Sequence, residues 1–310
     1  MAKRVRVLLA APRGFCAGVR RAIDAVLEAL DRYGAPVYVR RPIVHNLEVV
    51  RGLEAKGAVF VEELDDVPKG SVVIFSAHGV SPSVKREARE RGLVAYDAMC
   101  PLVAKVHREV ERHERNNRQI ILVGHAGHPE IDGIEGHIHR TTAIIVNSAK
   151  EVEALSLDRH TPTAYAVQTT YSVQDAAKVV DALKERFFDL SGPASSDICY
   201  ATSNRQAATR EIAARSDAVI VVGESFSSNA TRLLEVASSL CPSADLVSGP
   251  AEIDWAKFRN ISTVGITAAA STPESSVEAV VAAMSERFCV VIDEIETAHE
   301  MATFKRLSIG

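Results

Sequence analysis

The chain has 310 residues, of which 47% are hydrophobic and 25% charged, a balance typical of globular proteins. Its net charge of −4 is mixed along the chain, which gives no electrostatic reason to expect a nucleic-acid partner. No apolar run approaches the ~20 residues of a membrane helix, and the apolar stretch near the N-terminus is too short for a signal peptide. Five cysteines are too few for a disulfide scaffold. We therefore expect a cytoplasmic protein with no membrane partner and two or three domains of about 100–200 residues each.

Short apolar runs rich in Val and Ile alternate with amphipathic stretches along most of the chain. Helices are predicted over 20–34, where Gly34 suits the C-terminal cap, and over 172–187, where Ser172 suits the N-cap. This alternation predicts an α/β fold of βαβ units, with parallel sheets covered by helices on both faces. The predicted strands in chain order are 5–10, 36–40, 71–79, 119–127, 143–146, 163–170, 218–225 and 262–268.

Three cysteines suggest a threefold internal repeat, because Cys16, Cys100 and Cys199 each stand in a turn before a helical pattern. They are separated by 84 and 99 residues, the length of one small α/β unit. Ligands bind at the carboxyl ends of strands in open α/β sheets, which is where these cysteines are expected. Each cysteine is followed further along by a polar cluster at a strand end, namely 76–81, 124–130 and 223–229.

The cysteines allow two interpretations. Thiols at three equivalent turns would converge between domains and could hold an iron–sulfur cluster, which normally has four cysteine ligands. With three ligands, one iron would keep an open position, as catalytic metals do. From spacing alone, three unrelated buried thiols are the better interpretation, since local C-x₂₋₄-C pairs are absent and reduced Cys is often buried. The other two cysteines, Cys241 before a proline and Cys289 at the start of an apolar run, are expected to serve packing.

The ten histidines divide into two groups by sequence context. The segment 124–130 has two histidines three residues apart, followed by Glu130, which suggests a zinc hydrolase as an alternative function. The H-E-x-x-H pattern on one continuous helix is missing, because Gly127 and Pro129 interrupt it. Four histidines lie at strand or turn ends: His45, His78, His125 and His128. Six lie among charged or polar residues and are expected on solvated faces: His107, His113, His137, His139, His160 and His299.

Hydroxyl and amide side chains follow three of the predicted strands, at 168–170, 227–229 and Ser271. Such groups at helix N-termini suit phosphate oxygens, although each alone is more simply explained as an N-cap. The chain has neither a Walker-type loop nor a G-x-G-x-x-G fingerprint, so three such loops beside histidines predict a small anionic ligand and not a nucleotide. No flavin or nicotinamide fingerprint occurs, so reducing power would have to come from a partner protein.

Eight motifs stand in order along the chain: PRGFCAGVRRAI, GAPVYVRRPIVHN, FSAHGVS, CPLVAKVH, GHAGHPE, QTTYSV, DICYATSNRQ and SSNATRL. Together they resemble the 4-hydroxy-3-methylbut-2-enyl diphosphate reductases, which end the methylerythritol phosphate route to isoprenoids. The resemblance runs from about residue 4 to 275 and fades in the C-terminal tail. It implies three small pseudo-equivalent α/β domains with mainly parallel sheets, in a trefoil around a central iron–sulfur cluster. The implied domains are 17–99, 100–196, and 1–16 with 197–295, followed by a tail at 296–310.

The resemblance also implies roles for individual residues. Cys16, Cys100 and Cys199 match the three ligands of a [4Fe–4S] cluster, which reverses the interpretation from spacing alone. Glu130 matches the acid that supplies protons, and Thr169 matches its hydroxyl partner. His125 receives no direct role. The residues that match substrate ligands are His45, His78, His128, Thr169, Ser227, Ser228, Asn229 and Ser271, and of these His128 and Thr169 are also expected to take part in catalysis.

The implied reaction is a reductive dehydroxylation that yields isopentenyl and dimethylallyl diphosphates. The allylic hydroxyl would bind the open iron, two electrons would enter through the cluster, and a proton from Glu130 would release the hydroxyl as water. The implied electron donor is a ferredoxin or a flavodoxin. A cluster-bearing sensor or diphosphate-binding protein of the same fold is the non-enzymatic alternative. The presence of Glu130 argues against it, because a pure binder has no use for a buried acid.

Two residues depart from the family's usual pattern. Met99 stands where Thr is usual, beside a cluster ligand, and is expected to alter the hydrogen bonding that tunes the cluster potential. Ala269 stands where Gly is usual, and its methyl group is expected to require a less extreme backbone angle in the diphosphate loop.

Overall fold

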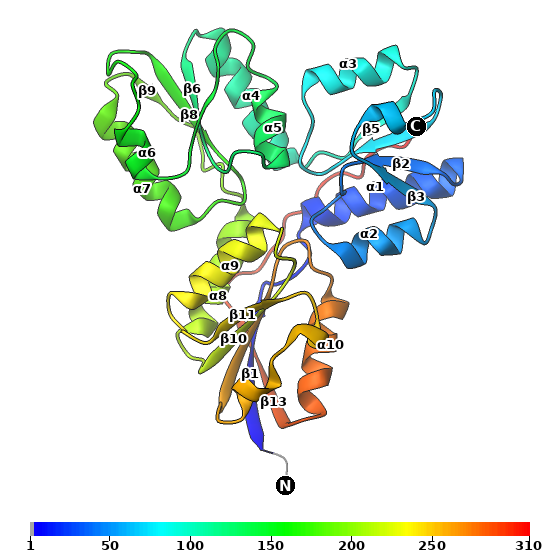
Figure 1. Cartoon of the computed structure of the whole chain (residues 1–310), viewed down its shortest axis with the longest axis vertical. Coiled ribbons are helices and arrows are strands. Elements are labelled where there is room, and N and C mark those ends of the chain that lie inside the picture. Colours follow the sequence, from blue (N-terminus) through cyan, green and yellow to red (C-terminus); the bar gives the residue numbers. More distant parts are fainter. Residues whose placement is uncertain (1–2) are drawn as a thin grey trace. The chain divides into compact units, whose positions relative to one another are not determined.

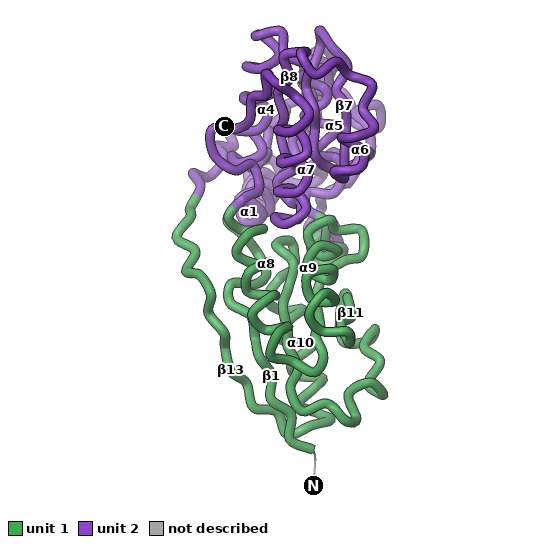
Figure 2. Tube along the Cα trace, turned by 90° about the vertical axis from the view of Figure 1, so that its left-hand side faces the viewer, with its two compact units in different colours: residues 1–17, 45–49, 200–303 green, residues 18–44, 50–199, 304–310 purple. Residues whose placement is uncertain are grey.

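The computed structural model describes residues 3–310 and contains three sheets of parallel strands with helices packed against them (Figure 1). The chain divides into two compact units (Figure 2). Unit 1 contains residues 1–17, 45–49 and 200–303, and unit 2 contains residues 18–44, 50–199 and 304–310. The domain limits given above stay a prediction.

The first sheet of unit 2 has the strand order β3-β2-β4-β5. Helix α1 buries Ala22, Ala25, Val26 and Ala29, whose helical spacing gives the helix one apolar face. It ends at Tyr33, and the next residue, the predicted cap glycine, has a φ of +74°. The elements are α1 (Ala17–Tyr33), β2 (Val37–Arg40), α2 (Leu47–Glu54), β3 (Ala58–Val61), β4 (Val72–Phe75), α3 (Pro82–Glu90) and β5 (Val94–Asp97), of which α1 and α2 each begin within residues assigned to unit 1.

The second sheet of unit 2 has the strand order β7-β6-β8-β9, with two helices on each face. Helices α4 (Pro101–Arg115) and α5 (Pro129–Glu135) pack on one face, and α6 (Ala149–Glu153) and α7 (Val173–Arg186) pack on the other. Ser172 caps α7 as predicted, because its side chain accepts a hydrogen bond from the Asp175 N–H. The strands are β6 (Gln119–Val123), β7 (Ile144–Val146), β8 (Thr163–Val167) and β9 (Leu190–Ser191).

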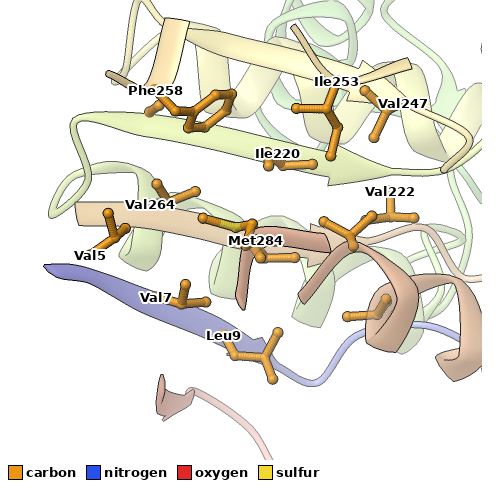
Figure 3. Close-up of a cluster of buried hydrophobic side chains, with 14 of the residues drawn as sticks. Val5, Val7, Leu9, Ile220, Val222, Val247, Ile253, Phe258, Val264 and Met284 are labelled. Carbon is orange, nitrogen blue, oxygen red and sulfur yellow. The ribbon is translucent and has the colours of Figure 1, made fainter. Parts of the chain in front are cut away.

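The sheet of unit 1 has the order β11-β10-β12-β1-β13. Figure 3 shows the apolar cluster on one face, where Val7, Ile220 and Val264 of three neighbouring strands pack with Phe258 and Met284. Burying such a side chain stabilises the fold by about 1.5–3 kcal/mol. Helices α8 and α9 cover the other face. The elements are β1 (Arg4–Ala11), α8 (Tyr200–Ala213), β10 (Ala218–Val222), α9 (Ser228–Ser238), β11 (Ala244–Val247), β12 (Thr263–Ala268), α10 (Glu274–Ser285) and β13 (Cys289–Glu296).

One strand order recurs in all three sheets and confirms the predicted threefold repeat. Counted from β2, β6 and β10 respectively, each sheet has its second strand at one edge, followed by the first and the third. The fourth place is taken by β5, β9 and, in unit 1, by β1 from the start of the chain. Five strands were not predicted, namely β3, β5, β9, β11 and β13, and each lies at the edge of its sheet. Edge strands have a half-exposed surface, so their apolar pattern is weaker than that of a covered strand.

Two expectations about individual side chains are wrong. Cys289 is exposed at the first residue of an edge strand and serves no packing role, whereas Cys241 is buried as expected. His107, His113 and His137 are buried and not on solvated faces. His107 and His113 lie on the same face of α4 as the buried residues Val103, Val106 and Val110, so helical periodicity overrides their charged sequence neighbours. Among residues 3–310, no helix is both long enough and apolar enough to span a membrane.

Candidate functional site

Each of the three candidate cluster ligands stands directly before the first residue of a helix. Cys16 precedes α1, Cys100 is the N-cap of α4, and Cys199 precedes α8. All three are half-buried thiols outside any disulfide.

The backbone N–H of each cysteine donates a hydrogen bond to the loop that follows a central strand, namely β12 for Cys16, β4 for Cys100 and β8 for Cys199. The N–H of Cys16 donates to the carbonyl of Ala270 at 3.2 Å, next to Ser271 in sequence. The N–H of Cys100 donates to the carbonyl before His78, at 3.0 Å. The N–H of Cys199 donates to the carbonyl of Thr169 at 3.2 Å. The repeat therefore places each predicted cluster ligand beside a predicted substrate ligand.

A buried arginine fixes the loop that carries Cys16. Arg205 of α8 donates from Nε and Nη2 to the carbonyl of Gly14, at 2.9 and 2.7 Å, and its Nη1 pairs with Glu300 at 2.8 Å. Gly14 has a φ of +63°, and a Cβ atom there would lie 3.0 Å from the carbonyl oxygen of Thr272. Glycine is therefore required at this position both for its backbone angle and for the close approach.

Glu130 and Thr169 form a buried pair in unit 2. The Thr169 N–H donates to Oε1 of Glu130 at 2.7 Å, and the Thr169 hydroxyl donates to Oε2 at 2.8 Å. Burial raises the pKa of Glu130 to about 7, helped by the nearby negative charge of Asp197 and opposed by the two Thr169 bonds. A carboxyl with a pKa near neutrality suits general acid catalysis.

His128 and His78 lie close to each other in the same unit. The rings are perpendicular, with centroids 5.9 Å apart, and Nδ1 of His78 lies 3.3 Å from the hydroxyl of Ser76. His128 caps α5, because its Nδ1 accepts the N–H of Glu130 at 3.1 Å. Since Nδ1 accepts, a neutral His128 carries its proton on Nε2 and can donate from that atom. His128, Glu130 and Thr169 are thus brought together as predicted.

The geometry of 124–130 does not present a zinc-hydrolase helix. His125 lies before α5, and its Nδ1 is 3.1 Å from Oε1 of Gln168. His128 only caps that helix. The two histidines therefore do not lie one turn apart on a common helix, which is the arrangement that the zinc motif requires.

The remaining predicted ligands belong to unit 1. Ser227 caps α9, with Ser228 and Asn229 in its first turn, and the Ser271 hydroxyl donates to the carbonyl of His45 at 3.0 Å. Burial lowers the pKa of the His45 ring to about 4, so the ring is neutral at neutral pH.

Asn229 has a buried side-chain amide. It is 5% exposed, and within residues 3–310 neither Oδ1 nor Nδ2 has a hydrogen-bond partner. A buried polar group without a partner costs about 1–3 kcal/mol. Both polar atoms of this amide at the start of α9 therefore keep unused hydrogen-bonding capacity among the described residues.

The two departures from the family pattern fit without strain. Ala269 is buried, has no positive φ, and donates its N–H to the carbonyl of Val222 at 3.0 Å. Gly223 makes room for it, since a Cβ atom at Gly223 would lie 3.1 Å from the Ala269 methyl group. Met99 packs against the turn that carries His78, where a Cβ atom on Gly79 would lie 2.6 Å from its sulfur.

Sequence reasoning assigned no role to three charged residues that shape these loops, namely Lys105, Asp197 and Arg205. Arg205 is 1% exposed, and Asp197 is also buried. For Lys105 and Arg205 the available signal was their position inside helical patterns, since charged residues are rarely buried without partners, whereas Asp197 lies in a loop and gave no such signal. Burial raises the pKa of Asp197 to about 6, while Lys105 lowers it.

Comparison with known proteins gives one consistent answer. The LytB protein family model matches residues 7–285. The 4-hydroxy-3-methylbut-2-enyl diphosphate reductase of Beijerinckia indica subsp. indica is 53% identical over 303 residues, which cover 97% of this chain and 95% of the relative. The enzyme of the same name from Methylocella silvestris is 52% identical with the same coverage.

A solved structure supports the same conclusion. The structure of the E-1-hydroxy-2-methyl-but-2-enyl-4-diphosphate reductase from Plasmodium falciparum is 37% identical in sequence to this chain and matches it with a TM-score of 0.93. The match covers 99% of this chain and 95% of that one. The α/β architecture with three parallel sheets is therefore shared with it. In sequence and in fold, the chain belongs to the LytB protein family.

Proposed function

We propose that this chain removes the hydroxyl group of 4-hydroxy-3-methylbut-2-enyl diphosphate reductively, giving isopentenyl and dimethylallyl diphosphates. The chain is an oxidoreductase, since it belongs to a family whose curated relatives are named as this reductase. The observation that carries the proposal is the buried Glu130–Thr169 pair, whose carboxyl keeps a proton near neutral pH. It lies beside His128 and in contact with the loop that accepts the N–H of Cys199.

Cys16, Cys100 and Cys199 would hold a [4Fe–4S] cluster. Three thiols at equivalent helix N-termini suit this group, which is bound by thiolates. When bound, the cluster would supply the two electrons and an iron without a cysteine ligand for the substrate hydroxyl. The electrons would come from a ferredoxin or flavodoxin, in a cytoplasmic location where thiols stay reduced.

The diphosphate would bind to the polar residues of unit 1. Ser227, Ser228 and Asn229 surround the N-terminus of α9, where helix N–H groups and partial positive charge favour an anion. The buried amide of Asn229 would then gain the partner that it lacks within residues 3–310. The Ser271 hydroxyl and the neutral His45 ring would add further contacts from the same unit.

Glu130 would supply the proton that converts the hydroxyl into water as the C–O bond breaks. The whole reaction consumes two electrons and two protons, and the second proton goes to carbon. Thr169 holds the carboxyl through both oxygens, so its orientation is fixed before substrate binds. His128 and His78 would hold the hydroxyl end of the substrate, with His128 donating from Nε2.

The test replaces Glu130 by glutamine, which keeps the shape and removes the acid. Anaerobic reconstitution followed by a reduced-dye assay on the hydroxylated diphosphate should show unchanged iron and substrate binding, with turnover lowered about 10²–10⁴-fold. Glu135→Gln, at the other end of α5, is the matched control and should keep full activity. Normal turnover by Glu130→Gln would refute the proton-donor role, and wild-type protein without iron after reconstitution would refute the cluster.

A further inference from the structure

An ion pair between Lys105 and Asp197 links the two segments of unit 2 that carry Cys100 and Cys199. Lys105 lies on α4, five residues after Cys100, and its Nζ lies 3.3 Å from Oδ1 of Asp197. The same ammonium donates to the carbonyls of Ser195 at 2.8 Å and Ser196 at 3.2 Å. The contact therefore runs from the helix that follows one predicted cluster ligand to the segment that precedes the other.

The far end of this contact is anchored a second time. The Asp197 side chain is fully buried, and its Oδ2 accepts the N–H of Val167, at the end of β8, at 3.0 Å. Two residues further on, the N–H of Cys199 donates to the carbonyl of Thr169. The segment before Cys199 is thus bound through Asp197 both to the end of β8, at Val167, and to α4, at Lys105.

The chemistry of lysine matches this position. An ammonium group has three N–H donors, and here three acceptors lie within 3.3 Å of it, all from residues 195–197. The Lys105 side chain is 26% exposed, so its charge is partly shielded from water by the same contacts. Without this ammonium, the buried Asp197 carboxylate would keep only its bond to the Val167 N–H within residues 3–310, which is unfavourable for a buried charge.

We propose that Lys105, through its contact with Asp197 and its neighbours, is a positioning residue that fixes the separation of Cys100 and Cys199. The role concerns the protein geometry first. Its consequence for a bound cluster rests on the function proposed above. Replacing a residue that orients a metal ligand without binding the metal itself typically lowers metal affinity about 10–100-fold.

The first experiment uses cluster-free protein and does not depend on the cluster. Nitroxide labels are placed on Cys100 and Cys199 in a chain whose other three cysteines are alanine, and pulsed electron paramagnetic resonance gives the distribution of distances between them. Lys105→Met should broaden this distribution, and Lys105→Arg should restore it. Lys178→Met, which removes an exposed lysine–aspartate pair elsewhere in unit 2, should leave it unchanged.

The second experiment measures iron release to a chelator after anaerobic reconstitution of the unlabelled chain. Lys105→Met should lose iron about 10–100-fold faster than wild type, and Lys105→Arg should behave like wild type. Leu64→Ala provides a control for general destabilisation, because it removes a fully buried side chain from an apolar cluster on the first sheet. Its melting temperature should fall without faster iron release.

The outcomes separate the two proposals. A distribution as narrow in Lys105→Met as in wild type would overturn the positioning role, whatever the iron content. Equal iron release from Lys105→Met and from an equally destabilised Leu64→Ala protein would do the same. Broadening in Lys105→Met, with no iron bound by any variant, would support the positioning role and refute the cluster.

Discussion

Replacing Glu130 by glutamine should change how the stability of the cluster-free protein depends on pH. The wild-type carboxyl has a pKa of about 7 in the folded chain, against 4.5 for an ordinary glutamate, because burial disfavours its charged form. The folded state therefore holds this proton more tightly than the unfolded state. The contribution of protonated Glu130 to the free energy of unfolding is therefore complete below pH 4.5 and is lost as the pH rises through 7.

The size of the effect follows from the two pKa values. The difference is about 2.5 pKa units, and at 1.36 kcal/mol for each unit it corresponds to about 3 kcal/mol of unfolding free energy. Glutamine does not titrate, so its variant lacks this loss. The free energy of unfolding of Glu130→Gln, minus that of wild type, should therefore rise by about 3 kcal/mol between pH 4.5 and a pH above 7. Asp197 also titrates abnormally, but it is present in both proteins and largely cancels in the difference.

The measurement is urea unfolding of reduced, cluster-free protein at closely spaced pH values. For Glu135→Gln, the plot of unfolding free energy against pH should run parallel to that of wild type. Thr169 bonds Glu130 and not Glu135, and Glu135 is less buried than Glu130. If the curves of Glu130→Gln and wild type are parallel, Glu130 is not a buried, protonated carboxyl at neutral pH. The argument for its role as a proton donor would then lose its physical basis.

Two further predictions concern single groups in the site. Thr169→Val removes a hydroxyl that stabilises the charged form of Glu130, so the pKa of Glu130 should rise by about 1–2 units. The alkaline limb of the pH profile of kcat should then move to higher pH, and an unmoved limb would contradict this reasoning. Thr170→Val is the control and should leave the profile unchanged. Asn229→Leu should raise the free energy of unfolding of the ligand-free chain by about 1–2 kcal/mol and weaken the binding of inorganic diphosphate, measured by urea unfolding and calorimetry. A destabilised variant would show that the amide has a partner in the fold.

The sequence predicted the covered parts of the fold better than the exposed parts. The central strands were identified because both of their faces are buried, which makes their apolar runs continuous. Strand β13 was missed although it begins with an apolar run, because it lies at an edge and its second half is mostly acidic. Helix α4 shows the opposite error: its histidines looked solvated beside charged neighbours, although helical spacing places His107 next to Val103 and Val106 on the buried face.

The site was predicted from motifs more than from patterns. Spacing alone left the cysteines as packing residues, and only the resemblance to a family turned them into predicted ligands. The contacts behind them could not be predicted in this way, because they join residues far apart in sequence. Lys105 meets Asp197 across 92 residues, and Arg205 meets Gly14 across 191. No local pattern encodes such partners, so only the fold reveals them.

The place of β1 in its sheet determines the order in which the molecule can be completed during synthesis. Its hydrogen-bonded neighbours are β12 and β13, which begin at residues 263 and 289. A ribosome adding about 5–20 residues per second needs roughly 13–50 s to pass from β1 to β12. During that interval the first strand lacks both of its neighbours in the sheet, whereas all strands of the two unit 2 sheets are synthesised. Among the three candidate cysteines, Cys16 therefore reaches its final position last, and any three-cysteine centre can form only after β12 and Ala270 have been synthesised.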